Sequence, residues 1–270
     1  MPSFGTNPPM FSALRSAWIW TAISLLIVVW LPLLWAISLF DKDPVRYRTG
    51  RWFRRLGVAM TKVNPTWELH VGGYQVSNPR RPYVVVSNHQ SLADIPLVSH
   101  LPWEMKWVGK KELFQLPIIG LMMKFSLDIP VDRKDPRSGA KMLLRCLKVL
   151  EQKCSVMFFP EGTRSPDGLL GRFNEGAFHL AIKAQVPILP VVVEGSFDGL
   201  PKKSWRFGKP AVITVKVLPP VETGGMTTKD SGALCESVRG IIAGELAQLR
   251  GTTVEMVDRL VREGTNAERK

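Results

Sequence analysis

The sequence lacks the patterns that mark several large classes of protein. Its three cysteines, Cys146, Cys154 and Cys235, form neither a metal-type spacing nor an even-numbered disulfide framework, so we predict buried free thiols in a reducing compartment and no metal site. There is no internal repeat, no zinc-finger spacing, no basic leucine-zipper pattern and no RNA-recognition aromatic signature. These absences exclude disulfide-stapled and repeat proteins, and they leave a nucleic-acid partner without a supporting motif.

Acidic residues are scarce relative to basic ones. The chain has 23 Asp and Glu against 36 Lys and Arg, which gives a formal net charge of +13. Such an imbalance indicates an anionic partner: nucleic acid, an anionic membrane or anionic substrates. Because nucleic-acid motifs are missing, we expect no nucleic-acid partner and favour an anionic membrane. At 270 residues and 45% apolar, the chain can form one substantial core plus an appendage.

Charge is absent altogether from residues 17–40. This stretch includes four tryptophans and would extend roughly 36 Å as a helix, enough to cross a hydrocarbon core of about 30 Å. It is too long for a cleavable signal peptide, and no small-x-small site follows it. Pro32 removes a backbone donor two-thirds of the way along, so a kinked span and a single-leaflet hairpin are both open.

Basic residues follow this apolar segment. They are interspersed with apolar side chains, a pattern typical of an amphipathic helix on an anionic surface, where each charge contributes about 1 kcal/mol. The positive charge on this side predicts that the remainder of the chain lies on the cytoplasmic face of the membrane. We therefore divide the chain into a membrane-anchoring and basic amphipathic region, 1–64, and an α/β domain, 65–270. The basic residues concerned are Lys42, Arg46, Arg48, Arg51, Arg54, Arg55 and Lys62.

The second region alternates short apolar runs with stretches of helical periodicity. Strands that alternate with helices predict an α/β fold, with a mixed, largely parallel sheet flanked by helices on both faces. The predicted strands are residues 67–71, 83–86, 105–108, 129–131, 156–159, 188–193 and 211–218.

A histidine and an aspartate follow the buried run at 83–86. His89 lies just past the expected C-terminal end of this strand, where open α/β sheets place their chemistry, and Asp94 comes five residues later. The carboxylate can hold the imidazole ring and fix its tautomer, which makes a general base without a protein nucleophile. The alternative is structural, because Ser91 and Asp94 also fit a capping box at a helix start.

A glycine turn comes after another buried run further along the chain. Gly162 lets the backbone approach a ligand closely, Thr163 supplies a hydroxyl, and Arg164 offers a planar fork suited to phosphate oxygens. Arg133 follows a different strand in the same way. Two prolines frame the apolar strand at 186–191, which suggests a rigid wall for packing or for an acyl chain. Each stretch by itself also fits a structural role.

In this order the stretches resemble the four motifs of the lysophosphatidate (1-acyl-glycerol-3-phosphate) acyltransferase family, within the glycerolipid acyltransferase superfamily. The resemblance is close over residues 81–194. The family implies transfer of a fatty acyl group from acyl-CoA or acyl carrier protein, as co-substrate, to the free hydroxyl of 1-acyl-glycerol-3-phosphate, giving phosphatidate without a further cofactor. The matching stretches are Asn88-His89-Gln90 with Asp94, Asp132-Arg133, Phe159-Pro160-Glu161-Gly162-Thr163-Arg164 and Val186-Pro187-Ile188-Leu189-Pro190.

The resemblance implies a role for each matching position. His89 would be the general base and Asp94 its orienting partner. A lipid hydroxyl has a pKa far above 7, so a base must take its proton as it attacks a thioester, and such catalysis is typically worth 10²–10⁴-fold. The residues implied to hold the acceptor phosphate or, for the last, to shape the acyl-donor side are Arg133, Glu161, Gly162, Thr163, Arg164 and Pro190.

One stretch departs from the family pattern. Members often carry a proline and a basic residue shortly before a Gly-Ala-Phe-His sequence, whereas this chain has Arg172-Phe173-Asn174-Glu175, and Arg172 is the candidate substitute for the missing charge. The departure keeps open an acyltransferase acting on another lysolipid, such as lyso-ornithine lipid. A non-catalytic membrane-binding module is the alternative from another class. We predict that His179, within the Gly-Ala-Phe-His sequence, is a packed or supporting residue.

Overall fold

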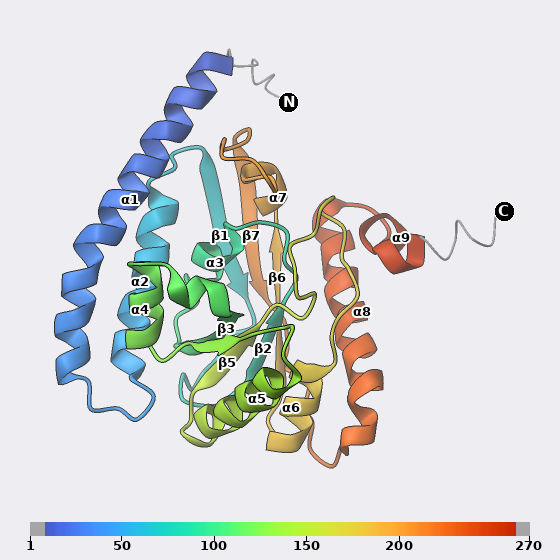
Figure 1. Ribbon diagram of the computed structural model, residues 1–270. Helices are drawn as coiled ribbons and strands as arrows, with labels where there is room; N and C mark the ends of the chain where they lie inside the picture. Colours follow the sequence, from blue (N-terminus) through green and yellow to red (C-terminus); the bar gives the residue numbers. More distant parts are fainter. Residues whose placement is uncertain (1–8, 263–270) are drawn as a thin grey trace.

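A seven-stranded sheet forms the centre of the molecule in the computed structural model, which describes residues 9–262 (Figure 1). The strands are β1 (Trp67–Gly73), β2 (Val84–Ser87), β3 (Met105–Lys110), β4 (Ile129–Val131), β5 (Ser155–Phe158), β6 (Ile188–Glu194) and β7 (Ala211–Val217). They lie in the order β1-β7-β6-β2-β5-β3-β4. Five neighbouring pairs are parallel, and β7 runs antiparallel to β6. The predicted mixed, largely parallel sheet is therefore confirmed.

The central strands are buried on both faces because their side chains alternate between two cores. Val84 and Val86 of β2 pack in one core, and Val85 packs in the other. All three are 0% exposed. A short run of β-branched residues suits a strand that is covered on both sides, which explains why the sequence signal at this position was clear.

Helices cover both faces of this sheet. On the face of Val86 lie α5 (Pro136–Glu151), α6 (Gly176–Ala184) and α8 (Ser231–Arg250), and α3 (Asp94–Val98) packs in the opposite core. Short helical segments lie between β3 and β4, between β6 and β7, and on either side of α8. These segments are η1 (Lys111–Gln115), α4 (Ile119–Phe125), α7 (Ser196–Gly199), η2 (Thr228–Asp230) and α9 (Val254–Val257).

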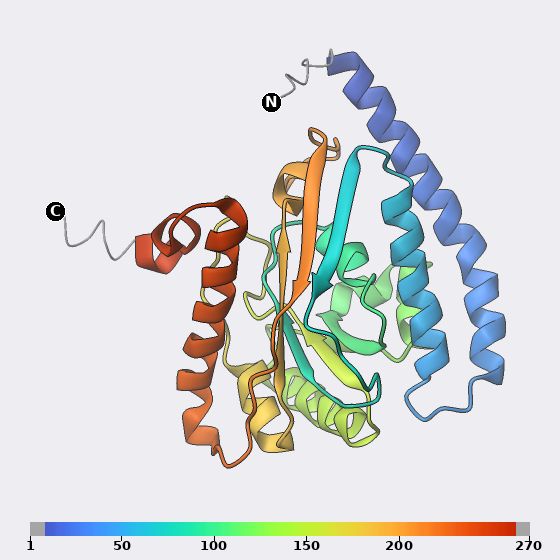
Figure 2. The same ribbon diagram turned by 180° about the vertical axis from the view of Figure 1, so that it is seen from behind.

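The two N-terminal helices form an antiparallel pair beside the sheet (Figures 1 and 2). They are α1 (Pro9–Phe40) and α2 (Tyr47–Lys62), joined by a turn at 41–46. The first runs as one helix through Pro32, so a hairpin with its turn at this proline is wrong. A proline removes one intrahelical hydrogen bond, which a long apolar helix tolerates. Among the residues that the structure describes, this helix is the one long and apolar enough to span a membrane.

Contacts hold α1 against the rest of the protein along much of its length. Leu34 is fully buried. Arg15 Nη2 donates to Gly208 O at 2.6 Å, and Trp30 Nε1 donates to Trp52 O of α2 at 2.9 Å. The outer face of α1 stays apolar. Its side chains that are more than half exposed include Trp18, Leu25, Val28, Val29, Trp35, Leu39 and Phe40.

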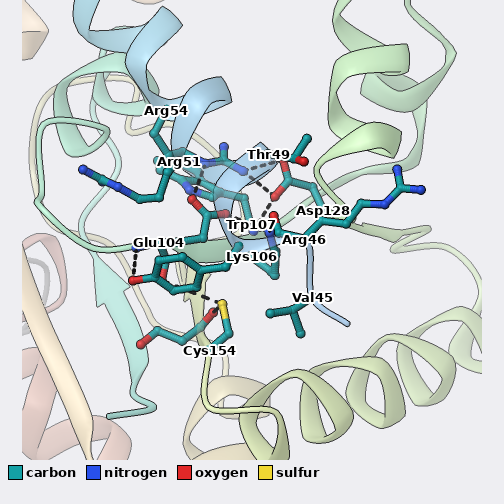
Figure 3. Close-up of polar contacts among 12 residues, drawn as sticks. Val45, Arg46, Thr49, Arg51, Arg54, Glu104, Lys106, Trp107, Asp128 and Cys154 are labelled. Carbon is teal, nitrogen blue, oxygen red and sulfur yellow. Dashed lines mark hydrogen bonds and ion pairs between the residues drawn. The ribbon is translucent and has the colours of Figure 1, made fainter. Parts of the chain in front are cut away.

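The basic residues of α2 do not share one outward face, which corrects the predicted surface helix. Arg54 is buried and forms an ion pair with both carboxylate oxygens of Asp128, at 2.6 and 2.7 Å (Figure 3). Arg51 Nη1 donates to Leu101 O at 2.8 Å. Only part of the positive charge therefore remains available to a membrane. The exposed cations of this helix recur at seven-residue spacing and are Arg48, Arg55 and Lys62.

All three cysteines are buried and free, as predicted. Burial raises the pKa of each thiol to about 12. Because the thiolate is the reactive form, these side chains act as small apolar groups near neutral pH.

Candidate active site

One side chain holds the loop after β2 against the neighbouring strand β6. Asn88 Nδ2 donates to Val193 O at 2.8 Å, and Val193 N donates back to Asn88 Oδ1 at 2.9 Å. The asparagine thus satisfies buried backbone groups where β2 itself has ended. The arrangement places His89 at the C-terminal edge of the central parallel strands, the edge at which open α/β sheets bind their ligands.

His89 and Asp94 are in direct contact. His89 Nδ1 lies 2.8 Å from Asp94 Oδ2. The same oxygen accepts from the backbone N–H of Gln90 at 2.7 Å and of Ser91 at 2.9 Å, and Ser196 Oγ donates to Oδ1. Asp94 is 0% exposed. The carboxylate therefore closes the turn before α3 and also orients the imidazole, so the structural and chemical interpretations of this residue are compatible.

The hydrogen-bond network assigns the tautomer of His89. An ionised carboxylate only accepts, so Nδ1 carries the hydrogen and the neutral ring has its lone pair on Nε2. The ring of Phe159 stacks on the imidazole, with centroids 4.1 Å apart and an interplanar angle of 18°. The His89 side chain is 14% exposed. The ring is thus held at one edge and on one face, and Nε2 has no hydrogen-bond partner within residues 9–262.

Both backbone groups of His89 bond to the glycine turn that follows β5. His89 N donates to Glu161 Oε1 at 2.7 Å, and Ser165 N donates to His89 O at 2.7 Å. Glu161 Oε2 accepts from Gly171 N at 3.0 Å. Burial raises the pKa of Glu161 to about 7. Because both carboxylate oxygens have backbone donors, Glu161 fastens the His89 loop and the segment at Gly171 to the glycine turn. Its role beside an acceptor phosphate stays a prediction.

Two arginines flank the glycine turn. Gly162 has φ 74°, in the left-handed region that favours glycine, and a Cβ there would lie 4.0 Å from Arg133 Nη1. The Arg133 guanidinium therefore reaches over the turn, and burial lowers its pKa. Arg164 is half-buried and Thr163 is exposed. Neither guanidinium has an ion pair in the described part of the chain, which makes this edge suitable for an anion.

Pro190 lies inside the sheet. It is buried in β6 opposite Val86 of β2, and its carbonyl accepts from Leu218 N at 2.9 Å. Its side chain thus contributes to the packed wall behind the loops. The role beside the acyl donor stays a prediction.

Residues far along the chain also hold this edge, and no sequence pattern predicts them. Glu194 Oε2 accepts from Gln90 Nε2 at 3.2 Å and from Arg250 Nη2 at 2.7 Å. The same Arg250 nitrogen donates to Gly168 O at 2.9 Å. Together with Ser196, these side chains brace the His89 loop and the segment after the glycine turn. Local patterns do not mark them because their partners lie 56 to 104 residues away.

The residues that depart from the family pattern are used within the protein. Asn174 donates to Pro160 O from its side chain at 2.7 Å and from its backbone at 2.9 Å. Glu175 Oε2 accepts from Ser231 Oγ of α8 at 3.1 Å. Arg172 is exposed. The altered stretch therefore reinforces the glycine turn and the attachment of α6 to α8.

His179 stands apart from these loops. It lies on α6, is half-buried, and lines an apolar groove with Leu143 and Leu147 of α5. Its role as a packed or supporting residue stays a prediction. Residues 9–262 contain no group of three or more His, Cys, Asp or Glu side chains placed to hold a metal ion.

The sequence is similar to acyltransferases over much of its length. Residues 68–194 match the family model described as Acyltransferase. The chain is 42% identical over 163 residues to 1-acyl-sn-glycerol-3-phosphate acyltransferase alpha of Mus musculus, covering 60% of this chain and 57% of that protein. It is 33% identical over 202 residues to the chloroplastic 1-acyl-sn-glycerol-3-phosphate acyltransferase LPAT1 of Arabidopsis thaliana, covering 74% and 55%. The chain thus spans a little more than half the length of these relatives.

A solved structure has the same fold. It is the crystal structure of the 1-acyl-sn-glycerophosphate (LPA) acyltransferase PlsC from Thermotoga maritima, which matches with a TM-score of 0.76 and 24% sequence identity. The match covers 90% of this chain and 98% of that one. The shared fold therefore extends beyond the 68–194 stretch.

Proposed function

We propose that the chain is a member of the 1-acyl-sn-glycerol-3-phosphate acyltransferase family, to which its matches are similar, and that it transfers a fatty acyl group from a thioester donor to the free hydroxyl of 1-acyl-glycerol-3-phosphate. The product is phosphatidate, a precursor in phospholipid biosynthesis. The proposal rests on one juxtaposition: His89, oriented by Asp94, lies in a loop bonded directly to the turn that carries Arg164.

In this proposal His89 acts as the general base. Its Nε2 takes the proton of the acceptor hydroxyl while the hydroxyl oxygen attacks the thioester carbonyl, and Asp94 stabilises the imidazolium that forms. The tetrahedral intermediate then collapses, the carbon–sulfur bond breaks, and the imidazolium gives its proton to the departing thiolate. The acceptor supplies the attacking hydroxyl, so the protein needs no nucleophile of its own.

The acceptor phosphate is held by Arg133 and Arg164, with Thr163 and the backbone at Gly162 beside them. Neither guanidinium forms an ion pair with the described residues, and each can match two phosphate oxygens with its planar fork. Holding the phosphate fixes the hydroxyl near His89 Nε2. General-base action supplies about 3–5 kcal/mol of the lowered barrier, and positioning of this kind supplies much of the rest.

The direct test is thioester-dependent acylation by the purified full-length protein. We expect His89→Ala to lower kcat by about 10³–10⁴-fold, because both the base and its charge stabilisation are lost. His70→Ala is the matched control, since His70 is an exposed histidine of the edge strand β1. Activity of His89→Ala close to that of the His70→Ala control would contradict the assigned base.

An acceptor panel separates lysophosphatidate from other lysolipids. Asn174 and Glu175, which had motivated a lyso-ornithine acceptor, bond to Pro160 and Ser231 within the protein. Their altered identity therefore does not point to a different acceptor. We expect lysophosphatidate to be turned over faster than lyso-ornithine lipid and than a monoacylglycerol that lacks the phosphate. Equal turnover of the three would remove Arg164 from its proposed role.

The donor is acyl-CoA or acyl carrier protein, and both present acidic groups. A basic surface of α5 can meet either one, because its cations are exposed and have no ion pair among the described residues. A comparison of initial rates with the two donors at equal concentration identifies the preferred one. The cations of this surface are Arg137, Lys141, Arg145 and Lys148.

The membrane contact is the apolar outer face of α1. The inner face of this helix is docked on α2 and on the loop before β7, from Arg15 to Leu34. A helix held sideways by a polar domain cannot cross the bilayer without that domain. We therefore place α1 in the plane of the membrane surface, with residues 1–64 as the anchor and residues 65–270 as the acyltransferase domain on the cytoplasmic side. Vesicle binding without any acyl transfer would favour the non-catalytic module instead.

A further inference from the structure

We propose that α2 is a positioning element of the active site as well as part of the membrane-anchoring pair. The position concerned is Gly57, where α2 seats the helix that carries Asp94. This inference rests on the proposed function, because it concerns the orientation of the His89–Asp94 pair. α2 precedes the 68–194 stretch that matches the acyltransferase model.

Asp94 is the first residue of α3, a helix of only five residues. Its carboxylate makes four contacts that converge from different segments, including the 2.8 Å contact with His89 Nδ1. A helix this short moves as a unit, so a displacement of its side or its C-terminal end reaches Asp94. The elements that pack against α3 therefore decide where the carboxylate points.

α2 meets α3 with no room for a side chain at Gly57. A Cβ built there would lie 2.8 Å from both Cβ and Oγ of Ser99, and 3.1 Å from Cα of Pro96. Carbon atoms in ordinary contact are about 3.5–4.0 Å apart, so an alanine would force the two helices to separate. Glycine is unfavourable inside a helix relative to alanine. Its presence in the middle of α2 thus reflects the close approach of α3.

A buried ionic network prevents α2 from moving away from α3 (Figure 3). Arg54, almost one turn before the glycine, is 5% exposed and bonds to Asp128. Glu104 and Lys106, both 0% exposed, pair at 2.9 Å under the same helix. A Cβ on Gly50 would lie 1.9 Å from Glu104 Oε1. Because outward movement of α2 would separate buried charges from their partners, α3 is the element that has to move.

The test compares alanine substitutions at two helical glycines. We expect Gly57→Ala to lower kcat by about 10- to 100-fold, the size of effect that a misplacement near 1 Å produces. The KM for lysophosphatidate should stay within about threefold, because the phosphate arginines lie on other segments. Gly240→Ala is the matched control: Gly240 is exposed on α8, and a Cβ there meets nothing within 4 Å. This control should keep its kcat.

A compensating variant makes the result specific to the α2–α3 contact. Ser99→Gly removes the two atoms nearest to a Cβ at position 57. The double variant Gly57→Ala/Ser99→Gly should therefore recover a large part of the lost kcat, whereas Ser99→Gly alone should change kcat little. Where Gly57→Ala lowers the yield of folded protein, Ser99→Thr applies a similar push from the α3 side through one extra methyl group.

The outcomes separate this inference from the proposed function. An unchanged kcat in Gly57→Ala would overturn the inference alone, provided that the unaltered protein is active. A loss that follows the fraction of folded protein, and that Ser99→Gly does not relieve, would also overturn it, because it would show a merely structural role. Absence of acyl transfer in the unaltered protein would overturn the proposed function and the inference with it.

Discussion

Two groups of arginines in this protein differ in their surroundings. Arg54 on α2 is buried, bonds to Asp128 and lies 3.7 Å from Glu104 Oε2. Arg133 and Arg164, at the edge beside His89, have no ion pair within residues 9–262. The denser basic cluster in the sequence is thus partly internal, while two isolated arginines are available to a ligand. The pairing of a cation, rather than the local density of basic residues, separates a structural charge from a functional one.

The largest effect should come from removing a paired, buried cation. We expect Arg54→Met to lower the free energy of unfolding by about 3–5 kcal/mol, because it leaves Asp128 as a buried charge without its partner. Arg48→Met, at an exposed position of the same helix, should change it by less than about 0.5 kcal/mol. Urea unfolding of the two variants measures both values. Equal losses would remove the distinction between internal and outward cations of α2.

The second-largest effect should come from a buried carboxyl group, Glu161, which has no bonded cation among the described residues. It should appear as a dependence of the free energy of unfolding on pH. The pKa of Glu161 is raised from 4.5 to about 7 by burial. Between these values the folded protein keeps a proton that the unfolded chain has lost. The free energy of unfolding should therefore fall as pH rises from about 4.5 to 7, by up to about 3 kcal/mol, and level off above that. Glu161→Gln should remove this part of the slope in unfolding measured at pH 5 and 7.5, and an identical slope in both proteins would refute the assignment.

Removing Arg164, a cation without an ion pair among the described residues, should weaken binding of the acceptor without destabilising the fold. Arg164→Met is expected to raise the KM for lysophosphatidate by about 10- to 100-fold, since hydrogen bonds to charged groups contribute about 1.5–3 kcal/mol each. Tm should change little, because no bond within the protein is lost. Steady-state kinetics with a monoacylglycerol acceptor provides the control, where wild type and variant should agree. A fall in Tm without a change in KM would place Arg164 in the structural group.

The smallest effect concerns the outward cations of α2. Single neutralisation of Arg48, Arg55 or Lys62 should weaken binding to anionic vesicles by about fivefold, or about 1 kcal/mol, and added salt should reduce the difference. Arg51→Gln is the comparison, because its guanidinium donates to Leu101 O within the protein. Vesicle co-sedimentation at several salt concentrations distinguishes them. Vesicle binding that does not depend on salt concentration would exclude an electrostatic contribution from these three cations.

The parts that the sequence predicted well have local causes. The strands at 83–86 and 188–193 could be located because β-branched runs between turn residues fit a doubly covered strand. The contact between His89 and Asp94 could be anticipated for a similar reason, since Asp94 comes only five positions after His89, across one turn. The order of the polar stretches supplied the resemblance to an acyltransferase family. Short-range patterns therefore carried the fold class and the candidate base.

The parts that the sequence did not predict depend on distant partners. The sequence pattern predicts a surface charge at Arg54, because its partner Asp128 lies 74 residues away. An alternation of basic and apolar residues does not show whether a helix faces lipid headgroups or a buried carboxylate. Ser196 and Arg250 carry no local signal for the same reason. Pro32 shows the opposite case, in which a local signal is strong but its prediction is wrong. A proline usually interrupts a helix, yet this one lies inside the long apolar helix α1.

Hydrogen bonds on either side of the histidine peptide join the loop that carries His89 to the glycine turn that carries Arg164. His89 N is bonded to Glu161 and His89 O to the amide of Ser165. In the proposed reaction, a headgroup bound at this turn would therefore influence the position of the imidazole, so binding energy from a remote part of the acceptor would assist the chemical step. An acceptor that lacks the phosphate should consequently be acylated with a lower kcat, as well as bound with a lower affinity. In the proposed reaction the phosphate, which passes unchanged into the product, would thus promote acyl transfer to a hydroxyl elsewhere on the same molecule.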